Sequence, residues 1–565
     1  MNILGIWDGH DSGAALLQDG KVRAAVNEER LTRRKLEIAF PSRSIAACLA
    51  AAGARPEQID AVAVTTTDPA KTLGRLWPGS KERYYAVRRR KAFPGLRARA
   101  TRAFKYRMTE WAPGAISRRI SRLALVRTLT RHGLSGASLR IVDHHRAHAA
   151  AAAFASGFGD CAVLTIDGLG DGLSATISRF EDGHLTRVTA SPASSSIGVF
   201  FEHVTNLLNM RELEDEGKVM ALADYAAPID DGRNPLIPLL RVEDGVIRTA
   251  RPGHALRPLL ARVHWQFANE QFAYLAQRAV EHAVVALARD AMRLTGKTRI
   301  ALAGGVVSNV KATRRIRLMP GVDGVFVFPH MGDGGLPLGG AIDVAASEGE
   351  ALEIDMDRLD LGPTYDDVEI DAEIQAAGLR ACPAPDLAAT VTNLLAAGRV
   401  VMWFQGGMEY GPRALGHRSV LARPDRPELR DRLNLVLKRR VWYQPFCPSM
   451  LESDAVRLLT DWDGGLNRAM TMAYEVASDE RQRLAGVISV DGTCRPQFVR
   501  DDDPGPFAAV LREARRRWGT GAVLNTSFNI HGEPLVCSPR DAVDVFVRSG
   551  ADALAIGPFL VERPA

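Results

Sequence analysis

A short histidine-rich segment is the first candidate for chemistry in this chain of 565 residues. Its letters, "IVDHHRAHAAAAAF", set His144, His145 and His148 ahead of a run of alanines. Residues four apart share one face of an α-helix, so His144 and His148 could bind a single ion while His145 points elsewhere. Asp143 is the expected N-cap of that helix. Taken alone, the pattern also fits a capped helix end that exposes polar histidines to water.

Four expected strands in the first half of the chain end in turns rich in glycine and aspartate. Their sequences are "WDGHDSG", "TIDGLGDG", "LAGGVVSN" and "FPHMGDGG". Glycine lets backbone N–H groups approach phosphate closely, and aspartate supplies oxygen ligands for a cation. A single such turn says little, but their recurrence at strand ends indicates a nucleotide site. Together with Asp167 and Asp333, the histidines His144 and His148 would form a set of two nitrogens and two oxygens suited to iron, manganese or zinc.

A second group of polar residues lies in the last third of the chain. "FQGGMEYGPRALGHRS" places Arg413 and Arg418 among glycine, proline and apolar residues, and "LKRRVWYQPFCP" adds Lys438 and Arg440. Guanidinium groups beside glycine turns suit phosphate or carbamate oxygens, because bidentate contacts fix the orientation of an anion. A solvated arginine face is the alternative, although these arginines follow no amphipathic repeat. Further on, "VLNTSFN" ends a buried strand with small hydrogen-bonding side chains.

The surrounding elements predict a globular α/β protein of more than one domain. Hydrophobic residues make up 46% and charged residues 24% of the chain, and the length indicates roughly two to four domains. No internal repeat is evident, and a turn-rich stretch near residue 350 predicts domains 1–352 and 353–565. Strands alternate with helices, which predicts a mostly parallel or mixed sheet. Expected strands lie at 2–7, 23–30, 60–66 and 161–167, and a long helix is expected at 270–296.

The charge and the cysteine content of the chain limit which partners the protein can bind and in which cellular compartment it is expected. The six cysteines form no CxxC pair, which argues against a disulfide framework or a thiolate zinc site. The chain starts without a basic leader and has no long apolar run, so a cytoplasmic protein without a membrane span is expected. The net charge of +6 hides a basic segment, 81–131, that is +14 by itself and leaves −8 elsewhere. We expect amphipathic helices with solvated arginines there, or a surface for nucleic acid, a membrane or an acidic acceptor.

Nine short motifs, taken in order along the whole chain, resemble those of the NodU/CmcH family of O-carbamoyltransferases. The resemblance implies an N-terminal actin-like ATPase domain, similar to the tRNA threonylcarbamoyl transferases, and a C-terminal YrdC-like domain. In such enzymes carbamoyl phosphate and ATP, which carries Mg²⁺, give a carbamoyl-adenylate in the second domain. The carbamoyl group then passes to an acceptor hydroxyl in the metal-bearing first domain. The motifs are "GHDSGAALLQDGKVRAAVNEER", "DHHRAHAAAAAF", "IDGLGDG", "EDEGKVMALA", "LAGGVVSN", "GDGG", "EYGPRALGHRS", "NTSFNIHGEP" and "DALAIGPFLV".

The resemblance also assigns roles to individual residues. His10 matches the proposed general base of the family, with a phosphate-binding N–H donor as the alternative role, and Arg418 and Lys438 are expected to take part in activation. The metal ligands, usually for iron and here expected to hold Fe(II), are His144, His148, Asp167 and Asp333. The expected contacts to nucleotide and anion are Asp11, Gly168, Asp171, Gly172, Glu216, Lys218, Gly304, Gly305 and Asn309 in the first domain, and Arg413, Arg440, Arg495, Asn525 and Ser527 in the second.

The chain departs from the family at one motif. Two other classes of protein also stay possible for this sequence. The family pattern "KxREx-F-RPFAP" is changed by Val441, Gln444 and Cys447, which stand for Glu, Arg and Ala. The loss of that arginine predicts that the anion is held differently. A tRNA threonylcarbamoyl transferase would use the basic segment for nucleic acid, and a non-enzymatic scaffold would only bind ATP. The motifs of the second domain favour a small-molecule alcohol, such as a sugar or an antibiotic precursor, and argue against nucleic acid.

Overall fold

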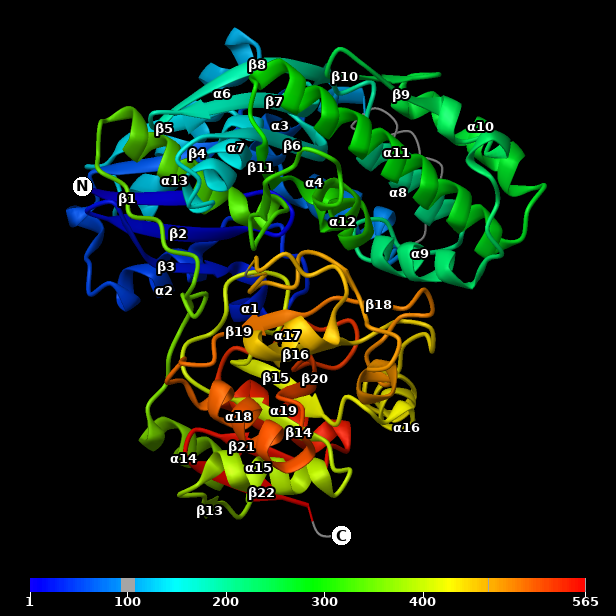
Figure 1. Ribbon diagram of the computed structural model, residues 1–565. Coiled ribbons are helices and arrows are strands. Elements are labelled where there is room, and N and C mark those ends of the chain that lie inside the picture. Colours follow the sequence, from blue (N-terminus) through cyan, green and yellow to red (C-terminus); the bar gives the residue numbers. More distant parts are fainter. Residues whose placement is uncertain (93–106, 466, 564–565) are drawn as a thin grey trace. The chain divides into compact units, whose positions relative to one another are not determined.

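The computed structural model describes residues 1–92, 107–465 and 467–563 (Figure 1). The chain divides into two compact units. The first contains Met1–Glu28 and Leu36–Met356, and the second contains Glu29–Lys35 and Asp357–Ala565. A short segment near the N-terminus therefore packs with the C-terminal unit, although its sequence neighbours on both sides belong to the first. Nothing in the sequence indicated this exchange.

The first sheet of the N-terminal unit has the strand order β3–β2–β1–β4–β5. Strand β1 (Asn2–Trp7) pairs antiparallel with β2 (Gly13–Gln18) and parallel with β4 (Ala61–Thr65). Strand β3 (Lys21–Asn27) extends the antiparallel side and β5 (Ser138–Val142) extends the parallel side. The strand expected at 23–30 therefore ends early, because a short helix follows it, and β2 was not expected at all.

The second sheet repeats this topology with the order β12–β11–β6–β7–β8. Three consecutive antiparallel strands again come first, and two parallel strands are added beside the first of them. This duplication is the actin-like architecture that the resemblance implied. It was not visible as a sequence repeat because the copies share strand order rather than letters. The strands are β6 (Cys161–Gly170), β7 (Leu173–Glu181), β8 (His184–Pro192), β11 (Arg299–Ala303) and β12 (Gly324–Val327).

Small residues explain the alanine run that follows the histidines. Helix α7 (His144–Ala155) packs against α13 (Leu336–Ser347). A Cβ atom on Gly339 would lie 2.1 Å from the carbonyl oxygen of Ala147, so only glycine permits the observed approach. The Asp143 side chain accepts a hydrogen bond of 2.8 Å from the Arg146 amide, which confirms the expected cap. The helix carrying the histidines is thus rigidly seated in the core.

Further helices cover the two sheets of this unit (Figure 1). The helix expected at 270–296 is confirmed as α11 (Asn269–Thr295). The basic segment forms α4 and α6, and its part at 93–106 lies outside the described residues. Among described residues, no helix combines the length and apolar character needed to cross a membrane. The remaining elements are α1 (Glu28–Thr32), α2 (Ser42–Ala51), α3 (Pro69–Leu76), α4 (Pro78–Arg88), α6 (Ala115–Arg131), α8 (Ile197–Leu207), α9 (Glu216–Leu222), α10 (Gly253–His264), α12 (Val310–Arg317), β9 (Leu240–Glu243) and β10 (Val246–Thr249).

The C-terminal unit is built on one mixed sheet of eight strands with the order β13–β22–β21–β14–β15–β20–β16–β19. Trp403 is fully buried at its centre, and its indole N–H donates to the carbonyl oxygen of Gly416 at 2.8 Å. The strands are β13 (Cys382–Pro383), β14 (Val401–Phe404), β15 (Arg418–Ala422), β16 (Cys447–Leu451), β19 (Gln497–Val499), β20 (Ala522–Ser527), β21 (Ala553–Ile556) and β22 (Phe559–Glu562). A small ribbon and helices complete the unit: β17 (Tyr474–Glu475), β18 (Thr493–Cys494), α14 (Asp367–Ala376), α15 (Leu387–Ala396), α16 (Pro427–Arg432), α17 (Glu452–Leu458), α18 (Pro506–Trp518) and α19 (Pro539–Ser549).

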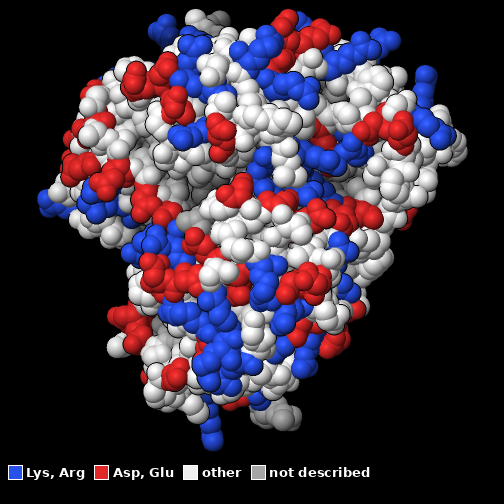
Figure 2. Space-filling view, in the orientation of Figure 1, with Lys and Arg blue, Asp and Glu red and all other residues white. Residues whose placement is uncertain are grey.

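On the face shown in Figure 2, acidic and basic side chains are interspersed. The local basic segment therefore does not turn this whole face positive, in keeping with the modest net charge of +6. Charge matters more inside the two units, where ionisable side chains gather without access to bulk water.

Candidate functional site

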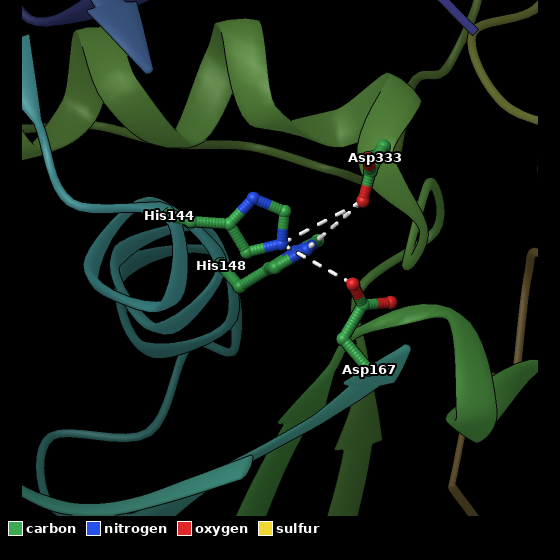
Figure 3. A group of neighbouring side chains, drawn as sticks. All are labelled: His144, His148, Asp167 and Asp333. Atoms are coloured by element: carbon green, nitrogen blue, oxygen red, sulfur yellow. Dashed lines mark hydrogen bonds and ion pairs between the residues drawn. The ribbon is translucent and has the colours of Figure 1, made fainter. Parts of the chain in front are cut away.

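Two histidines and two aspartates form a buried cluster in the N-terminal unit (Figure 3). His144 and His148 project from successive turns of α7, whereas Asp167 lies on β6 and Asp333 begins a short turn before α13. One potential ligand atom from each residue lies within 4.8 Å of all the others. The structure therefore brings together all four residues that the sequence pattern singled out.

The geometry of this cluster fits a divalent cation. The Nε2 atom of His144 lies 3.2 Å from Asp167 Oδ2 and 3.7 Å from Asp333 Oδ1, and Nε2 of His148 lies 3.6 Å from the same Asp333 atom. His148 Nε2 is buried yet makes no hydrogen bond to any described residue. A buried polar atom without a partner is costly, and an ion would supply that partner. Two imidazoles and two carboxylates suit iron, manganese or zinc.

Neighbouring residues hold the ligands in place. The Gly305 amide donates to Asp167 Oδ1 at 2.7 Å, which leaves the other carboxylate oxygen directed at His144. Asp171 accepts the backbone N–H of His144 at 2.8 Å. A Cβ atom on Gly170 would lie 2.2 Å from the His144 ring, so this position requires glycine. Although burial opposes the charge, the two aspartates raise the pKa of His144 to about 9.

The predicted base His10 lies beside this cluster. Its Nδ1 atom is 3.3 Å from Asp333 Oδ2 and 3.5 Å from the Tyr85 hydroxyl. Trp7 donates its indole N–H to the His10 carbonyl oxygen at 2.8 Å and so fixes the loop. Burial, aided by the positive charges of Arg89 and Lys71 and opposed by Asp333, lowers the pKa of His10 to about 4. A neutral imidazole is the form that can accept a proton near pH 7.

Several residues expected to touch nucleotide also support the protein around the cluster, and their contact to nucleotide stays a prediction. Asp171 and Gly305 orient metal ligands, as described above. Asn309 accepts the Ala312 amide and donates to Gln277 at 2.8 Å, so its side chain starts α12 and ties it to α11. Gly304 adopts a φ of +100° and has no room for a Cβ atom. Gly172 also adopts a left-handed φ, and the Gly168 carbonyl accepts from Ser196 at 2.6 Å.

The other expected contacts of the first unit lie in polar turns. The Asp11 carboxylate accepts the Asn27 side-chain N–H at 3.2 Å, and His330 Nε2 donates to the side-chain oxygen of the same asparagine at 2.9 Å. Lys218 pairs with Asp215 at 2.8 Å. Burial, together with the negative charge of Glu202, raises the pKa of Glu216 to about 8. Glu216 is thus an electrostatically strained carboxyl, which a nearby cation would relieve.

Three arginines surround a sulfur atom in the C-terminal unit. Arg495 donates from Nε and Nη2 to Cys447 Sγ at 3.1 and 2.9 Å. Arg413 and Arg440 interact electrostatically with Cys447 and Arg495. Arg413 Nε and Arg440 Nη2 are buried and make no hydrogen bond to described residues, and none of the three guanidinium groups forms an ion pair with a described carboxylate. Asn525, paired with Cys447 across the sheet, also has a buried oxygen without a partner.

This arrangement is electrostatically unsatisfied. Burial and the charge of Arg495 lower the pKa of Arg413 to about 9. Burial likewise lowers the pKa of Arg440 to about 10, with Cys447 opposing and Arg495 adding to the effect. Buried cations that lack counter-charges are expensive unless an anion joins them. The cluster therefore has the chemistry of an anion site, and the substituted position Cys447 lies within it.

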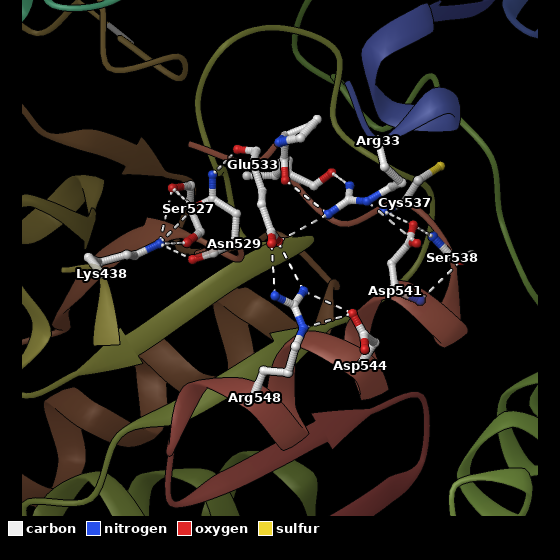
Figure 4. Close-up of polar contacts among 12 residues, drawn as sticks. Arg33, Lys438, Ser527, Asn529, Glu533, Cys537, Ser538, Asp541, Asp544 and Arg548 are labelled. Atoms are coloured by element: carbon white, nitrogen blue, oxygen red, sulfur yellow. Dashed lines mark hydrogen bonds and ion pairs between the residues drawn. The ribbon is translucent and has the colours of Figure 1, made fainter. Parts of the chain in front are cut away.

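Lys438 lies at the centre of a second polar cluster in this unit (Figure 4). Its ammonium group donates to Ser527 Oγ at 3.2 Å, to the Asn529 carbonyl at 2.9 Å and to Asn529 Oδ1 at 2.8 Å, and also to the Ser527 carbonyl. All these acceptors are neutral. Burial, aided by the positive charges of Arg440 and Lys35, holds the pKa of Lys438 well below its usual range. Ser527 thus lies where expected, beside the predicted lysine.

Arg418 is the most deeply buried of the arginines expected in the second site. Its side chain is fully buried and stacks on the Phe404 ring, with the guanidinium carbon 3.6 Å from the ring centroid. Backbone carbonyls take up its donors: those of Gln405, Gly406, His417, Pro363 and Cys537 accept at 2.9 to 3.5 Å. These contacts stabilise the fold around Arg418, and its expected part in the activation step stays a prediction.

Comparison with known proteins gives this geometry its context. Residues 2–342 match the sequence family described as "Carbamoyltransferase N-terminus", and residues 392–563 match "Carbamoyltransferase C-terminus". The chain belongs to the carbamoyltransferase family. This carbamoyltransferase is 32% identical over 569 residues to "Nodulation protein NolNO" of Sinorhizobium fredii, covering 98% of the chain and 79% of the relative.

Two further similarities are more partial. The enzyme is 32% identical over 240 residues to the 3'-hydroxymethylcephem-O-carbamoyltransferase of Amycolatopsis lactamdurans, a match that covers 42% of this chain and 44% of that one. The solved structure of HypF from T. kodakarensis overlaps 62% of the chain and 48% of its own length, with 14% identity and a TM-score of 0.37.

Sequence patterns missed some residues that complete the two sites. Tyr85 reaches His10 from the basic segment, where aromatic residues had suggested only packing or stacking on nucleic acid. Asn27 and His330 support Asp11 from separate elements. Arg33 reaches the loop beside Lys438 from the other end of the chain (Figure 4). No spacing rule finds these contacts, because they join residues that are distant in sequence.

Proposed function

We propose that this carbamoyltransferase is an ATP-dependent O-carbamoyltransferase that acts in two steps. Activation takes place in the domain at 353–565, which we take to be YrdC-like, and transfer to an alcohol takes place in the domain at 1–352. The observation that carries the proposal is the cluster of half-buried arginines Arg413, Arg440 and Arg495, which lack carboxylate partners among the described residues. In a carbamoyltransferase, carbamoyl phosphate is the anion that best fits such a cluster.

In the activation step, the arginine cluster would bind the phosphate group of carbamoyl phosphate. Water hydrolyses carbamoyl phosphate to carbamate and inorganic phosphate, and a carbamate oxygen then attacks the α-phosphorus of ATP and expels pyrophosphate, leaving carbamoyl-adenylate. Mg²⁺ would accompany the ATP phosphates. Lys438 donates only to neutral oxygens, so its charge is available to steady the negative charge that develops during this exchange.

In the transfer step, the acceptor hydroxyl attacks the carbamoyl carbon and AMP leaves. His10 would take the hydroxyl proton, because its imidazole is neutral near pH 7 and Asp333 can hold the opposite ring nitrogen. His144, His148, Asp167 and Asp333 would hold a divalent ion, which we propose to be Fe(II). When bound, such an ion acts as a Lewis acid toward oxygen groups of the reacting molecules.

The glycine turns of the actin-like domain support nucleotide binding beside the metal cluster. Asp11, Gly168 and Gly172 lie on such turns, and Glu216 is a carboxyl that would gain from a nearby cation. We propose that ATP or the adenylate binds along these turns and that the acceptor is a small molecule, such as a sugar or an antibiotic precursor. The named cephem carbamoyltransferase among the relatives supports an acceptor of this kind.

The proposal is tested by following both halves of the reaction with the full-length protein. It is incubated with ATP, Mg²⁺, ¹³C-labelled carbamoyl phosphate and a panel of sugar, aminoglycoside and cephem alcohols. We expect release of pyrophosphate and a product that has gained one labelled carbamoyl group. Turnover that requires threonine and tRNA would instead support a threonylcarbamoyl transferase. Nucleotide binding without pyrophosphate release in any mixture would support the ATP-binding scaffold.

A further inference from the structure

A segment from the N-terminal part of the chain packs inside the C-terminal unit. Residues 29–35 belong to that unit, although 28 and 36 belong to the other. Leu31 packs against an apolar cluster formed by Met408, Ala414, Leu535 and Cys537. These four residues come from the two loops that flank the proposed activation site, so Leu31 joins both loops.

Polar contacts reinforce this packing. Arg30 donates from Nη2 to the carbonyl oxygen of Gly411 at 2.9 Å. Gly411 lies in the same loop as Arg413 of the anion cluster. The segment therefore holds the arginine-bearing loop through Arg30 and reaches the second loop through its next residues.

Arg33 makes the contacts to the second loop (Figure 4). Its guanidinium group donates to the carbonyl oxygen of Pro534 at 3.2 Å and to that of Leu535. It also pairs with Asp541 at 3.5 Å and with Glu533 at 3.9 Å. The residue adopts a φ of +61°, a left-handed conformation that is uncommon for arginine. The backbone is thus bent at the residue whose side chain spans the loop.

This loop in turn positions the lysine of the activation site. The Glu533 carbonyl accepts the side-chain N–H of Asn529 at 2.7 Å. The oxygen of that same amide accepts from Lys438 Nζ at 2.8 Å and from Ser527 Oγ at 2.7 Å. A continuous set of hydrogen bonds therefore runs from Arg33 through the loop and Asn529 to Lys438 (Figure 4).

We propose that Arg33 is a positioning residue that sets the place of Lys438 for the activation step. The inference rests on the proposed function, because it assigns Lys438 to carbamoyl-adenylate formation. Arg33 touches neither substrate nor cofactor in this account. It fixes the backbone of residues 533–535 and through Asn529 the orientation of the lysine ammonium group.

Arg548 provides a matched control within the same network. It pairs with both carboxylate oxygens of Glu533 at 2.8 and 3.1 Å. It has no hydrogen bond to the carbonyls of 534 and 535, where Arg33 binds. Both arginines therefore pair with the Glu533 carboxylate, but Arg33 also donates to the backbone carbonyls of the loop. Arg33→Ala and Arg548→Ala separate these two contributions.

The experiment compares full-length wild type, Arg33→Ala, Arg33→Lys and Arg548→Ala by hydrogen–deuterium exchange and by pyrophosphate release. For Arg33→Ala we expect exchange in residues 527–538 to speed up at least about tenfold, while exchange in α7 and α11 is unchanged. The kcat of pyrophosphate release should fall at least about tenfold. Arg33→Lys should be intermediate, because one ammonium group cannot bind both carbonyls and both carboxylates, and Arg548→Ala should stay within about twofold of wild type.

The outcomes are distinct. Unchanged exchange at 527–538 in Arg33→Ala overturns the positioning role, as does equal loss in Arg33→Ala and Arg548→Ala, since Glu533 would then be responsible. Unchanged kcat despite faster exchange also overturns it. Should wild type release no pyrophosphate, the proposed activation step fails, and the exchange result by itself decides whether Arg33 holds the loop.

Discussion

The two polar clusters of this carbamoyltransferase differ in how their charge is balanced. In the N-terminal unit, His144 and His148 face Asp167 and Asp333, so a cation site contains its own negative charge. In the C-terminal unit, Arg413, Arg440 and Arg495 gather with no described carboxylate partner. We propose that the first cluster binds a metal ion and that an anion balances the second. One chain thus keeps complementary kinds of binding site in separate units.

The comparison also shows what a buried arginine can mean. Arg418 and Arg413 lie in the same sequence motif, but the donors of Arg418 are taken up by five backbone carbonyls, whereas Arg413 retains a buried N–H without a partner. We propose that the first arginine mainly stabilises the fold and that the second binds the anion. Only the hydrogen bonds of the two side chains distinguish these arginines, because both lie in the same sequence motif.

The largest effect should come from Arg418→Leu, which tests the structural side of this distinction. Removal of the guanidinium group leaves several buried carbonyls without donors, and we expect the free energy of unfolding to drop by at least about 3 kcal/mol. Urea unfolding of the C-terminal unit, followed by tryptophan fluorescence, measures this loss. A variant that is as stable as wild type but cannot activate carbamoyl phosphate would instead support the direct role of Arg418 in activation that the sequence predicts.

Arg413→Met should behave in the opposite way. Replacing a buried, unpaired cation by an apolar side chain of similar length should stabilise the protein by about 1–3 kcal/mol in the absence of anions. Activation, measured by pyrophosphate release, should fall about 100-fold, and inorganic phosphate should no longer raise the melting temperature. Arg516→Met, at an exposed position paired with Glu513, is the control and should change neither property. A destabilised Arg413→Met protein would contradict an unbalanced anion site.

Glu216 offers a pH test within the first unit. Its pKa is about 8 when folded, against an ordinary value of 4.5, so the folded state keeps a proton that the unfolded state releases. Stability should therefore decrease as pH rises from about 4.5 to about 8 and then level off. Glu216→Gln should remove this slope and exceed wild type in stability at pH 9 by about 1–3 kcal/mol. If urea unfolding from pH 5 to 9 showed that the stability of both proteins falls equally with pH, a raised pKa of Glu216 would be ruled out.

The smallest effect is expected at the start of the histidine helix. Asp143→Ala removes the side-chain cap of α7, which should cost about 1 kcal/mol, whereas Asp143→Asn should cost less because it keeps the capping oxygen. Thermal unfolding of the metal-free protein checks the order of the two variants. The same cost for both would show that the ion pair of Asp143 with Arg187, at 2.6 Å, matters more than the cap.

The sequence predicted that two histidines and two aspartates would come together, because the signals for this grouping are local. One-turn spacing places His144 and His148 on one face, and strand-end turns place the aspartates. The duplicated sheets and the exchange of residues 29–35 could not be predicted, since they depend on tertiary packing with no local pattern. The complete burial of Arg418 and its contacts to backbone carbonyls could not be predicted for the same reason.

The most direct test of the two-site account measures both half-reactions in His148→Ala and Arg413→Met. His148→Ala should lose most of about one bound metal per chain and should fail to carbamoylate an alcohol, yet it should release pyrophosphate at a rate close to wild type. Arg413→Met should keep its metal and release little pyrophosphate. This reciprocal pattern, read by elemental analysis, pyrophosphate assay and product mass, is the predicted result. Loss of pyrophosphate release in His148→Ala together with undiminished release in Arg413→Met would contradict the assignment of activation to the arginine cluster and of transfer to the metal cluster.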